Sequence, residues 1–403
     1  MFYNAPMRLL TQIEKQRVCD LLTSLVGINS VVISPEQANH DRAEERMADF
    51  LNDHLHKMGM TVELREVYPG RPNLIAHWPG QGGNRSMMLE SHMDTVSTEG
   101  MTVAPFAAQI LNGRMYGRGT CDTKGSTAAF LTALAIAAES GQLPNDKLYY
   151  VGTVSEETGC LGAAELVKSG FRTEAAIVGE PTGCRVVTAH KGPLWMEIET
   201  RGKACHASVP DEGVNAIEMM SRIVAFVHGP WKEYLQGRRH PMLGASTMAV
   251  TMIDGGMMVN IIPASCKASL DGRLIPALSA KETVNDFQRM LAAYLGDDTD
   301  FVVTKIESNP PLDCPSDAPL TGRLLELCGR ANGQNRPEGV HYFADSGAFY
   351  QAGIRTVLFG PGNIAQAHKA DEYIEVNQLF QATEIILNLL TEHAGKPILC
   401  NAE

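Results

Sequence analysis

The sequence lacks the cysteine patterns that build disulfide frameworks or structural zinc sites. Its nine cysteines are scattered and include no C-x-x-C pair. A disulfide framework or a zinc knuckle would need pairs at regular spacing. We therefore expect reduced thiols, as in a protein kept in a reducing compartment.

Long apolar runs and basic clusters are also missing. No apolar stretch approaches the roughly 18 residues of a membrane-spanning helix. The first residues lack the charged start and apolar core of a secretory signal. The formal net charge is −12 and no run of Lys and Arg stands out, so nucleic acid and anionic membrane surfaces are poor partners. These absences predict a cytoplasmic protein that binds neither membrane nor nucleic acid.

What is present is the composition of a globular protein, with 44% hydrophobic and 20% charged residues. A length of 403 residues suggests two to three units of ordinary domain size. Helical spacing in Asp41–Met58 and β-rich runs at Ser86–Glu90 and Lys147–Val154 alternate along the first part of the chain. Such alternation favours an α/β layer with a largely parallel sheet.

The middle of the chain follows a different order, which is strand, helix, strand, strand, helix, strand. The six segments are Leu194–Thr200, Asn215–Phe226, Thr247–Ile253, Cys266–Leu270, Glu282–Leu295 and Phe301–Ile306. This βαββαβ order is that of a ferredoxin-like unit. We therefore predict an inserted domain at residues 191–310 that separates two parts of one α/β domain, 1–190 and 311–403.

Five short segments concentrate side chains that could bind a metal. Several follow directly after a predicted strand, where open α/β sheets bind their ligands. Imidazole and carboxylate without thiolate suit zinc or a similar divalent metal. One His and two or three carboxylates per metal, with a bridging Asp, would build a two-metal site with an open position for water. The segments are Ser91–Asp94, Gly119–Asp122, Ser155–Gly159, Gly179–Thr182 and Ala367–Lys369.

Each segment alone has a simpler explanation. A single His or Asp in a loop is commonly a surface or hydrogen-bonding residue. The adjacent Glu156 and Glu157 could be two solvated charges at a helix start. The His92-x-Asp94 pair is more specific, because a carboxylate near a ligating imidazole fixes its tautomer.

Taken together, four stretches resemble motifs of a known family in the family's own order. They are Ser91–Val96, Gly117–Gly125, Ser155–Gly162 and Gly179–Thr182. They resemble the co-catalytic zinc peptidases and deacylases that include acetylornithine deacetylase, succinyl-diaminopimelate desuccinylase and carboxypeptidase G. The resemblance covers nearly the whole chain. It implies a zinc-peptidase-type three-layer α/β/α catalytic domain with an inserted ferredoxin-like lid and dimerisation domain.

The resemblance also implies two divalent metal ions per chain, zinc or cobalt, with five ligands. Asp122 would bridge both ions. His92 and Glu180 would complete one ion, and Glu157 and His368 the other.

Further roles follow from the same resemblance. Glu156 would be the general base, and Asp94 would orient His92. The family places a cis peptide after the bridging Asp, here Asp122–Thr123. Glu rather than Asp at Glu180 accompanies acylamino-acid and carboxypeptidase activities in this family, rather than aminopeptidase activity.

Three residues of the inserted domain resemble substrate-contacting positions of the family. His206 resembles the His that reaches the active site of a partner subunit, which implies a homodimer. Asn260 and Arg273 resemble residues that hold a substrate carboxylate, and an Arg fork fits a carboxylate bidentately. His206 could instead be an ordinary turn residue, and Arg273 a surface salt-bridge partner.

Within the family, three stretches are closest to acetylornithine deacetylase, an enzyme of arginine biosynthesis. They are Gly179–Thr182 followed by Ala189–Gly192, Gly213–Glu218, and Gly360–Gly362 leading to Gln366–His368. This predicts hydrolysis of a small N-acyl-L-amino acid. Ala344–Gly347 departs from the family motif, because many members carry an Arg soon after the Asp. The preference of the site for a particular substrate side chain therefore stays open. The alternatives are a metallocarboxypeptidase or dipeptidase with the same site, and a non-catalytic binding protein on this fold.

Overall fold

The computed structural model describes residues 6–32, 42–79, 85–296 and 300–399. The chain divides into two compact units. Unit 1 comprises Met1–Thr188, Cys314–Glu338 and Ala344–Glu403, and unit 2 comprises Ala189–Asp313 and Gly339–Phe343.

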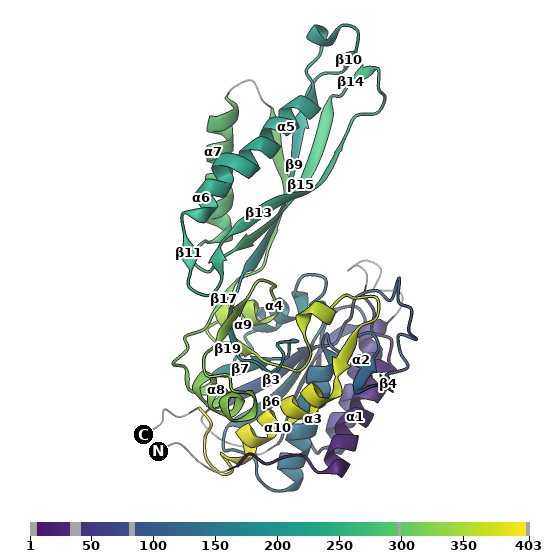
Figure 1. Ribbon diagram of the computed structural model, residues 1–403, viewed down its shortest axis with the longest axis vertical. Helices are drawn as coiled ribbons and strands as arrows, with labels where there is room; N and C mark the ends of the chain where they lie inside the picture. The colour runs from purple at the N-terminus through teal and green to yellow at the C-terminus, as the bar shows by residue number, and fades with distance from the viewer. Residues whose placement is uncertain (1–5, 33–41, 80–84, 297–299, 400–403) are drawn as a thin grey trace. The chain divides into compact units, whose positions relative to one another are not determined.

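The largest sheet has nine strands in the order β1-β2-β6-β3-β7-β19-β8-β17, with β18 also paired to β8 (Figure 1). Its four central strands, β6, β3, β7 and β19, are parallel. The strands are β1 Thr61–Tyr68, β2 Arg71–His77, β3 Ser86–His92, β6 Lys147–Thr153, β7 Ala175–Val178, β8 Val187–His190, β17 Leu312–Asp313, β18 Glu338–Val340 and β19 Arg355–Leu358.

The sheet is therefore mixed rather than largely parallel, because antiparallel strands flank the parallel centre on both sides. At one side, β1 and β2 are joined by the two residues Pro69 and Gly70, with Tyr68 paired to Arg71. So short a connection can only produce an antiparallel hairpin. At the other side, β8 pairs antiparallel with β19 and β17.

Helices cover both faces of this sheet and give unit 1 its three layers. Helices α1, α3 and α10 pack against one another, and α4 and α9 form a second group against the sheet (Figure 1). Strands β2 and β3 are buried along almost their whole length, as expected for strands covered on both faces. The helices are α1 Gln12–Val26, α2 Ala43–Lys57, α3 Lys124–Glu139, α4 Leu161–Lys168, α8 Pro319–Asn332, α9 Ser346–Gln351 and α10 Val376–Thr391, with a 3-10 turn at Ile364–Gln366.

A small three-stranded sheet, β20-β5-β4, completes unit 1. Its strands are β4 Gln109–Leu111, β5 Arg114–Tyr116 and β20 Tyr373–Glu375. In the described ranges, no helix is both long and apolar enough to cross a membrane.

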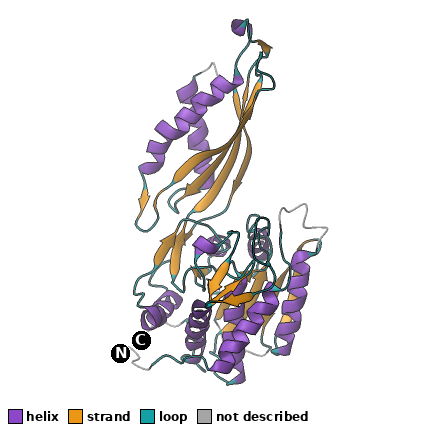
Figure 2. Ribbon diagram, turned by 45° about the vertical axis from the view of Figure 1, so that its right-hand side comes forward, coloured by secondary structure: helices purple, strands orange, loops and turns teal. Residues whose placement is uncertain are grey.

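Unit 2 has the predicted ferredoxin-like order. Its antiparallel sheet β13-β15-β9-β16 carries α5 and α7 on one face (Figure 2). Trp231 lies at the centre of the core, with its ring 5.0 Å from Phe287 and 6.2 Å from Phe226. The main elements are β9 Gly192–Arg201, α5 Ala216–Phe226, β13 Thr247–Gly255, β15 Ser265–Leu274, α7 Ala280–Leu295 and β16 Phe301–Ser308.

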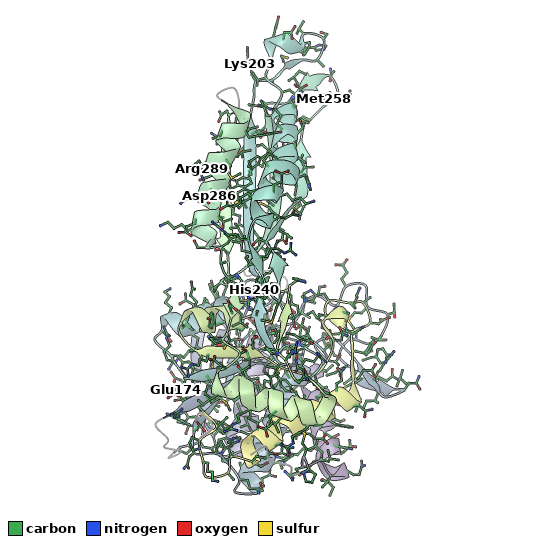
Figure 3. All side chains as sticks on the ribbon, turned by 60° about the vertical axis from the view of Figure 1, so that its left-hand side comes forward. Glu174, Lys203, His240, Met258, Asp286 and Arg289 are labelled. Carbon is green, nitrogen blue, oxygen red and sulfur yellow. The ribbon has the colours of Figure 1, made fainter. Side chains whose placement is uncertain are left out.

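Shorter elements extend unit 2 at its ends. A small two-stranded antiparallel sheet, β10-β14, stands at the end that carries Met258, and Asp286 and Arg289 pair at 2.7 Å on α7 (Figure 3). Met257 and Val259 beside Met258 are almost fully exposed, at 94% and 103%. The short elements are β10 Cys205–His206, a 3-10 turn Pro210–Glu212, a π-helical turn Val227–Trp231, α6 Lys232–Gln236, β11 Arg239–His240, β12 Gly244–Ala245 and β14 Ile261–Ile262.

The return segment Gly339–Phe343 belongs to unit 2, although the sequence pattern placed it with residues 311–403. Phe343 packs edge-on against Trp195 at 5.8 Å between ring centroids. Gly339 lies so close to Leu243 that no side chain would fit at that position. Five residues carry no periodicity that could reveal such packing from sequence.

Candidate metal centre

The predicted ligands of unit 1 follow neighbouring strands of the sheet. His92 ends β3, and β3 lies between β6 and β7. Glu157 lies in the loop after β6, and Glu180 lies two residues after β7. Because these strands are parallel, their carboxyl ends meet at one edge. The sheet topology therefore brings three ligands from distant parts of the sequence to one place.

Asp122 lies between the two predicted imidazole ligands. Its Oδ1 is 3.1 Å from Nε2 of His92, and its Oδ2 is 3.5 Å from Nε2 of His368. Nε2 of His368 is also 3.0 Å from Oε2 of Glu157. Ligand atoms of His92, Asp122 and Glu157 all lie within 4.8 Å of one another, an arrangement that could hold a metal ion. One carboxylate thus faces a different imidazole with each oxygen.

The cluster buries more negative charge than its two imidazoles balance. Burial, reinforced by neighbouring carboxylates, raises the pKa of Glu157 to about 7 and that of Glu180 well above its usual range. Hydrogen bonds to Asp122 and Glu157 raise the pKa of His368 to about 10. Burial lowers the pKa of His92, but contacts with neighbouring carboxylates outweigh it and the net shift is upward. The raised pKa values of the two carboxyls and of the two imidazoles show an excess of negative charge from the carboxylates. Bound cations would offset this charge.

The donor set fits divalent metal ions. The side chains that meet here offer imidazole nitrogens and carboxylate oxygens, which suit zinc and similar ions. Among the described residues, Oε1 of Glu157 is buried and has no hydrogen-bond partner. A buried carboxylate oxygen without a partner is costly unless a cation or a donor meets it.

Glu156 differs from the adjacent Glu157 in its contacts. It is not among the residues whose ligand atoms converge with those of His92. Its Oε1 lies 3.7 Å from Sγ of Cys160, the residue that precedes α4. Burial, followed by the charge of Glu180, raises the pKa of the Glu156 carboxyl well above its usual range. The two adjacent acids therefore occupy separate environments.

Asp94 connects His92 to the loop that carries these two acids. Nδ1 of His92 lies 3.0 Å from the backbone carbonyl oxygen of Asp94 and 3.4 Å from its carboxylate. The same carboxylate accepts hydrogen bonds from the backbone N–H of Glu156 at 3.2 Å and of Glu157 at 3.1 Å. Asp94 thus contacts the loop as well as the imidazole that the sequence assigned to it.

The loop that carries Asp122 is held by a residue that the sequence did not reveal. The buried carboxylate of Glu372 accepts hydrogen bonds from the backbone N–H groups of Gly119, Cys121 and Asp122, at 2.9, 2.7 and 3.0 Å. It also pairs with Arg118 at 2.8 Å. Glu372 precedes a short strand far along the chain, and in the sequence it resembles a surface acid. The expected cis peptide between Asp122 and Thr123 is confirmed.

The three predicted substrate residues of unit 2 fall at two places. His206 and Asn260 meet at the two-stranded sheet β10-β14, where the N–H of Ala207 donates to the carbonyl oxygen of Asn260 at 2.9 Å. His206 is exposed, and its Nδ1 lies 2.7 Å from Oγ of Ser208. Arg273 instead lies on β15 and pairs with Asp271 at 2.8 Å. The structure thus brings two of the three residues together.

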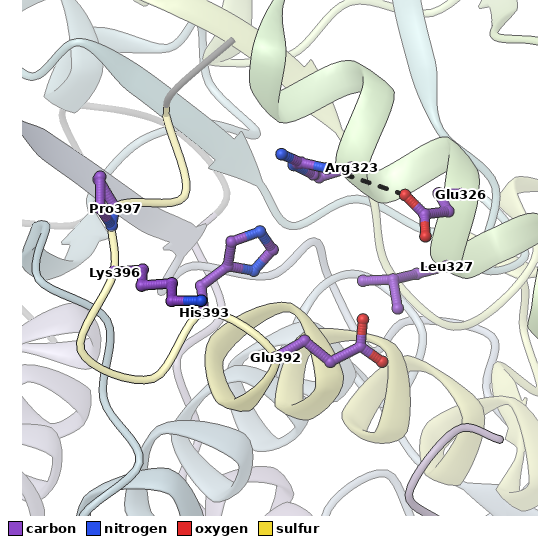
Figure 4. A pocket seen from close by; sticks show the side chains of 7 residues that line it. All are labelled: Arg323, Glu326, Leu327, Glu392, His393, Lys396 and Pro397. Atoms are coloured by element: carbon purple, nitrogen blue, oxygen red, sulfur yellow. Dashed lines mark ion pairs between the residues drawn. The ribbon is translucent and has the colours of Figure 1, made fainter. Parts of the chain in front are cut away.

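Unit 1 also has a surface pocket of about 320 Å³ between α8 and the end of α10, and none of the predicted site residues lines it (Figure 4). Arg323 and Glu326 in its wall pair loosely at 4.0 Å. Glu392 pairs with Arg330 at 2.7 Å. This pocket is therefore separate from the cluster around Asp122.

Known proteins resemble this chain over most of its length. Residues 88–392 match the model of peptidase family M20/M25/M40. An acetylornithine deacetylase from Edwardsiella ictaluri (strain 93-146) is 34% identical over 376 residues, which are 89% of this chain and 93% of the relative.

Solved structures agree with the fold. A tripeptidase from Staphylococcus aureus superposes with a TM-score of 0.78 at 21% identity, covering 94% of this chain and 98% of that one. A dinuclear metal binding peptidase of the M20 family from Bacillus subtilis gives a TM-score of 0.67 at 15% identity, covering 94% and 99%. At these identities the structures establish the fold, while the family match and the relative establish descent. The chain is a hydrolase that belongs to peptidase family M20/M25/M40.

Proposed function

We propose that this protein hydrolyses the amide bond of a small N-acyl-L-amino acid, in the manner of an acetylornithine deacetylase, with two zinc ions bound around Asp122. The observation that carries the proposal is the position of Asp122, whose two oxygens face His92 and His368 separately. A carboxylate placed in this way is suited to bridge two ions. The 34% identical acetylornithine deacetylase supports the substrate class.

The ligands divide around this bridge. His92 and Glu180 would hold one ion, and Glu157 and His368 the other. The contact of 3.0 Å between His368 and Glu157 supports their assignment to a common ion. When bound, two such ions would acidify a water molecule and polarise the scissile carbonyl. The M20 peptidase from Bacillus subtilis, described as dinuclear, supports the number of ions.

Glu156 would act as general base. Its side chain is half-buried beside the cluster and its carboxylate does not join the cluster, so it is available for proton transfer. It would accept a proton from the attacking water and then donate this proton to the leaving amine. Burial, followed by the charge of Glu180, raises the pKa of this carboxyl, and this favours the exchange because the carboxylate becomes a stronger proton acceptor.

Residues of unit 2 would recognise the substrate. Asn260 and Arg273 would hold the free carboxylate, and Asp271 already fixes the Arg273 guanidinium at 2.8 Å. His206, supplied by a neighbouring chain, would stabilise the negative charge that develops on the carbonyl oxygen. Exposed Met252 and Ile253 lie on β13, at one edge of the four-stranded sheet, and support pairing with a second copy.

A substrate panel tests the reaction class. We expect release of free amino acid from N-acetylornithine or another N-acyl amino acid, with kcat/KM well above that for any dipeptide. An N-acyl amino acid whose carboxylate is blocked as an amide is the matched control, and it should be cleaved poorly because Asn260 and Arg273 lose their ligand. Faster release from dipeptides would assign the site to a dipeptidase or carboxypeptidase instead.

The two adjacent acids should respond differently to substitution. Glu156→Ala should lower kcat by about 10²–10⁴-fold and keep both metal ions, because a general base is not a ligand. Glu157→Ala should lose one ion per chain. Elemental analysis of each variant beside its turnover number separates the two roles. The opposite pattern, with metal lost from the Glu156 variant, would reverse the assignment.

Mixed dimers test whether His206 is shared between chains. Glu156→Ala and His206→Ala dimers should each be nearly inactive. After subunit exchange, the chain that keeps Glu156 would receive an intact His206 from its partner. With random reassociation half the dimers are mixed, so roughly a quarter of all sites should work. If the exchanged mixture stayed as inactive as its components, His206 would act within its own chain or not at all.

A further inference from the structure

Three consecutive backbone amides of the loop after β6 are each held by a buried carboxylate. The N–H of Ser155 donates to Oε1 of Glu44 at 2.7 Å. The next two amides, of Glu156 and Glu157, donate to the two oxygens of Asp94. The loop therefore has two anchors, and only Asp94 comes from the motifs that mark the metal site in the sequence.

The Glu44 anchor is part of a buried ion pair. Glu44 lies in the first turn of α2, and Arg71 is the first residue of β2. Their side chains pair and are almost completely buried, with exposures of 0% and 1%. The Arg71 guanidinium also donates to Oγ of Ser155, so Glu44 and Arg71 hold the backbone and the side chain of the same residue.

Ser155 is the point at which the loop changes direction. Its φ of 62° is in the left-handed region, which a non-glycine residue adopts only when its surroundings favour it. The two contacts to Glu44 and Arg71 supply such surroundings. Glu156 and Glu157 follow directly, so the conformation of Ser155 determines where both carboxylates point.

A buried ion pair is an expensive way to hold a fold together, because both charges lose their hydration. A well-packed apolar pair would serve stability as well. What apolar side chains cannot do is accept a hydrogen bond from an amide and donate one to a hydroxyl at fixed positions. The chemistry of Glu44 and Arg71 therefore matches a positioning task more closely than a packing task.

We propose that Glu44 and Arg71 are positioning residues that fix the Ser155 turn, and through it place the general base Glu156 and the metal ligand Glu157. The inference rests on the proposed function for the roles of those two acids. A displacement of about 1 Å at a reacting group can cost about 100-fold in rate. Outer residues that orient ligands typically contribute about 10–100-fold to metal affinity or activity.

The most selective variant is Ser155→Ala, because it removes the hydroxyl that Arg71 holds and leaves the Glu44–Arg71 pair intact. Arg71→Lys is the conservative partner variant, since it keeps the charge but cannot reach Glu44 and Ser155 with two nitrogens at once. We expect each to lower kcat about 10- to 100-fold with little change in KM. The matched control is Arg330→Met, which removes the Arg of another Arg–Glu pair of unit 1 and should leave kcat unchanged.

Two further readouts separate positioning from stability. Titration of the metal-free protein with Zn²⁺ should show weakened binding at one of the two sites in Ser155→Ala, without any turnover being measured. With Zn²⁺ at saturation in a Glu156→Ala background, Ser155→Ala should cause a clearly smaller further loss of kcat, because the general base that it positions is already absent. A merely structural role would lower kcat by the same factor in both backgrounds.

The inference is wrong if Ser155→Ala and Arg71→Lys keep wild-type kcat and zinc affinity, or if they lose only thermal stability. Failure of the proposed function would look different, since wild-type protein would then hydrolyse no N-acyl amino acid. The zinc titration would still report on the Ser155 turn in that case.

Discussion

The structure depends on keeping a cluster of acidic groups close together away from water. Asp122, Glu157 and Glu180 lie at one edge of the central sheet, and His92 and His368 offset part of their charge directly. Without cations, burial and mutual repulsion raise the pKa values of Glu157 and Glu180, and this opposes folding. Burial acts in the same direction on the pKa of Asp122, but hydrogen bonds to His368 and His92 outweigh it and the net shift is downward. The arrangement is favourable when divalent ions bind, because the carboxylates then coordinate the ions and no longer repel one another. We regard this balance as the reason for the rigid framework around the site.

That framework consists of acidic side chains that accept hydrogen bonds from the backbone amides of the site loops. Glu372 holds the loop that contains Asp122, Asp94 holds the amides of the two acids after β6, and Glu44 holds the turn before them. Each is buried, and each comes from a different segment of the chain. The loops can therefore be irregular and still well defined, because six of their backbone amides donate to these three buried carboxylates.

The sequence predicted well which side chains of unit 1 come together and in what order the unit 2 elements follow, because both depend on local patterns. His92-x-Asp94 and the Glu156–Glu157 pair are short motifs, and the strand and helix periods of unit 2 are regular. The sequence did not reveal the residues that hold the site loops, because their contacts are not local. Glu44 and Glu372 act across 111 and 250 residues of sequence, and each resembles a surface acid in its own segment. The antiparallel pairing of β1 and β2 was missed although their short connection, Pro69 and Gly70, could have revealed it. The direction of β8 was missed because the pattern of a buried strand does not reveal its direction.

The central claim is that Asp122 bridges two metal ions. Titration of metal-free protein with Zn²⁺, followed by elemental analysis, tests it most directly. The account predicts two ions per chain in the wild type, loss of one in His368→Ala, and weakened binding of both in Asp122→Ala. Binding of a single ion by the wild type, or retention of two tightly bound ions by Asp122→Ala, would contradict it.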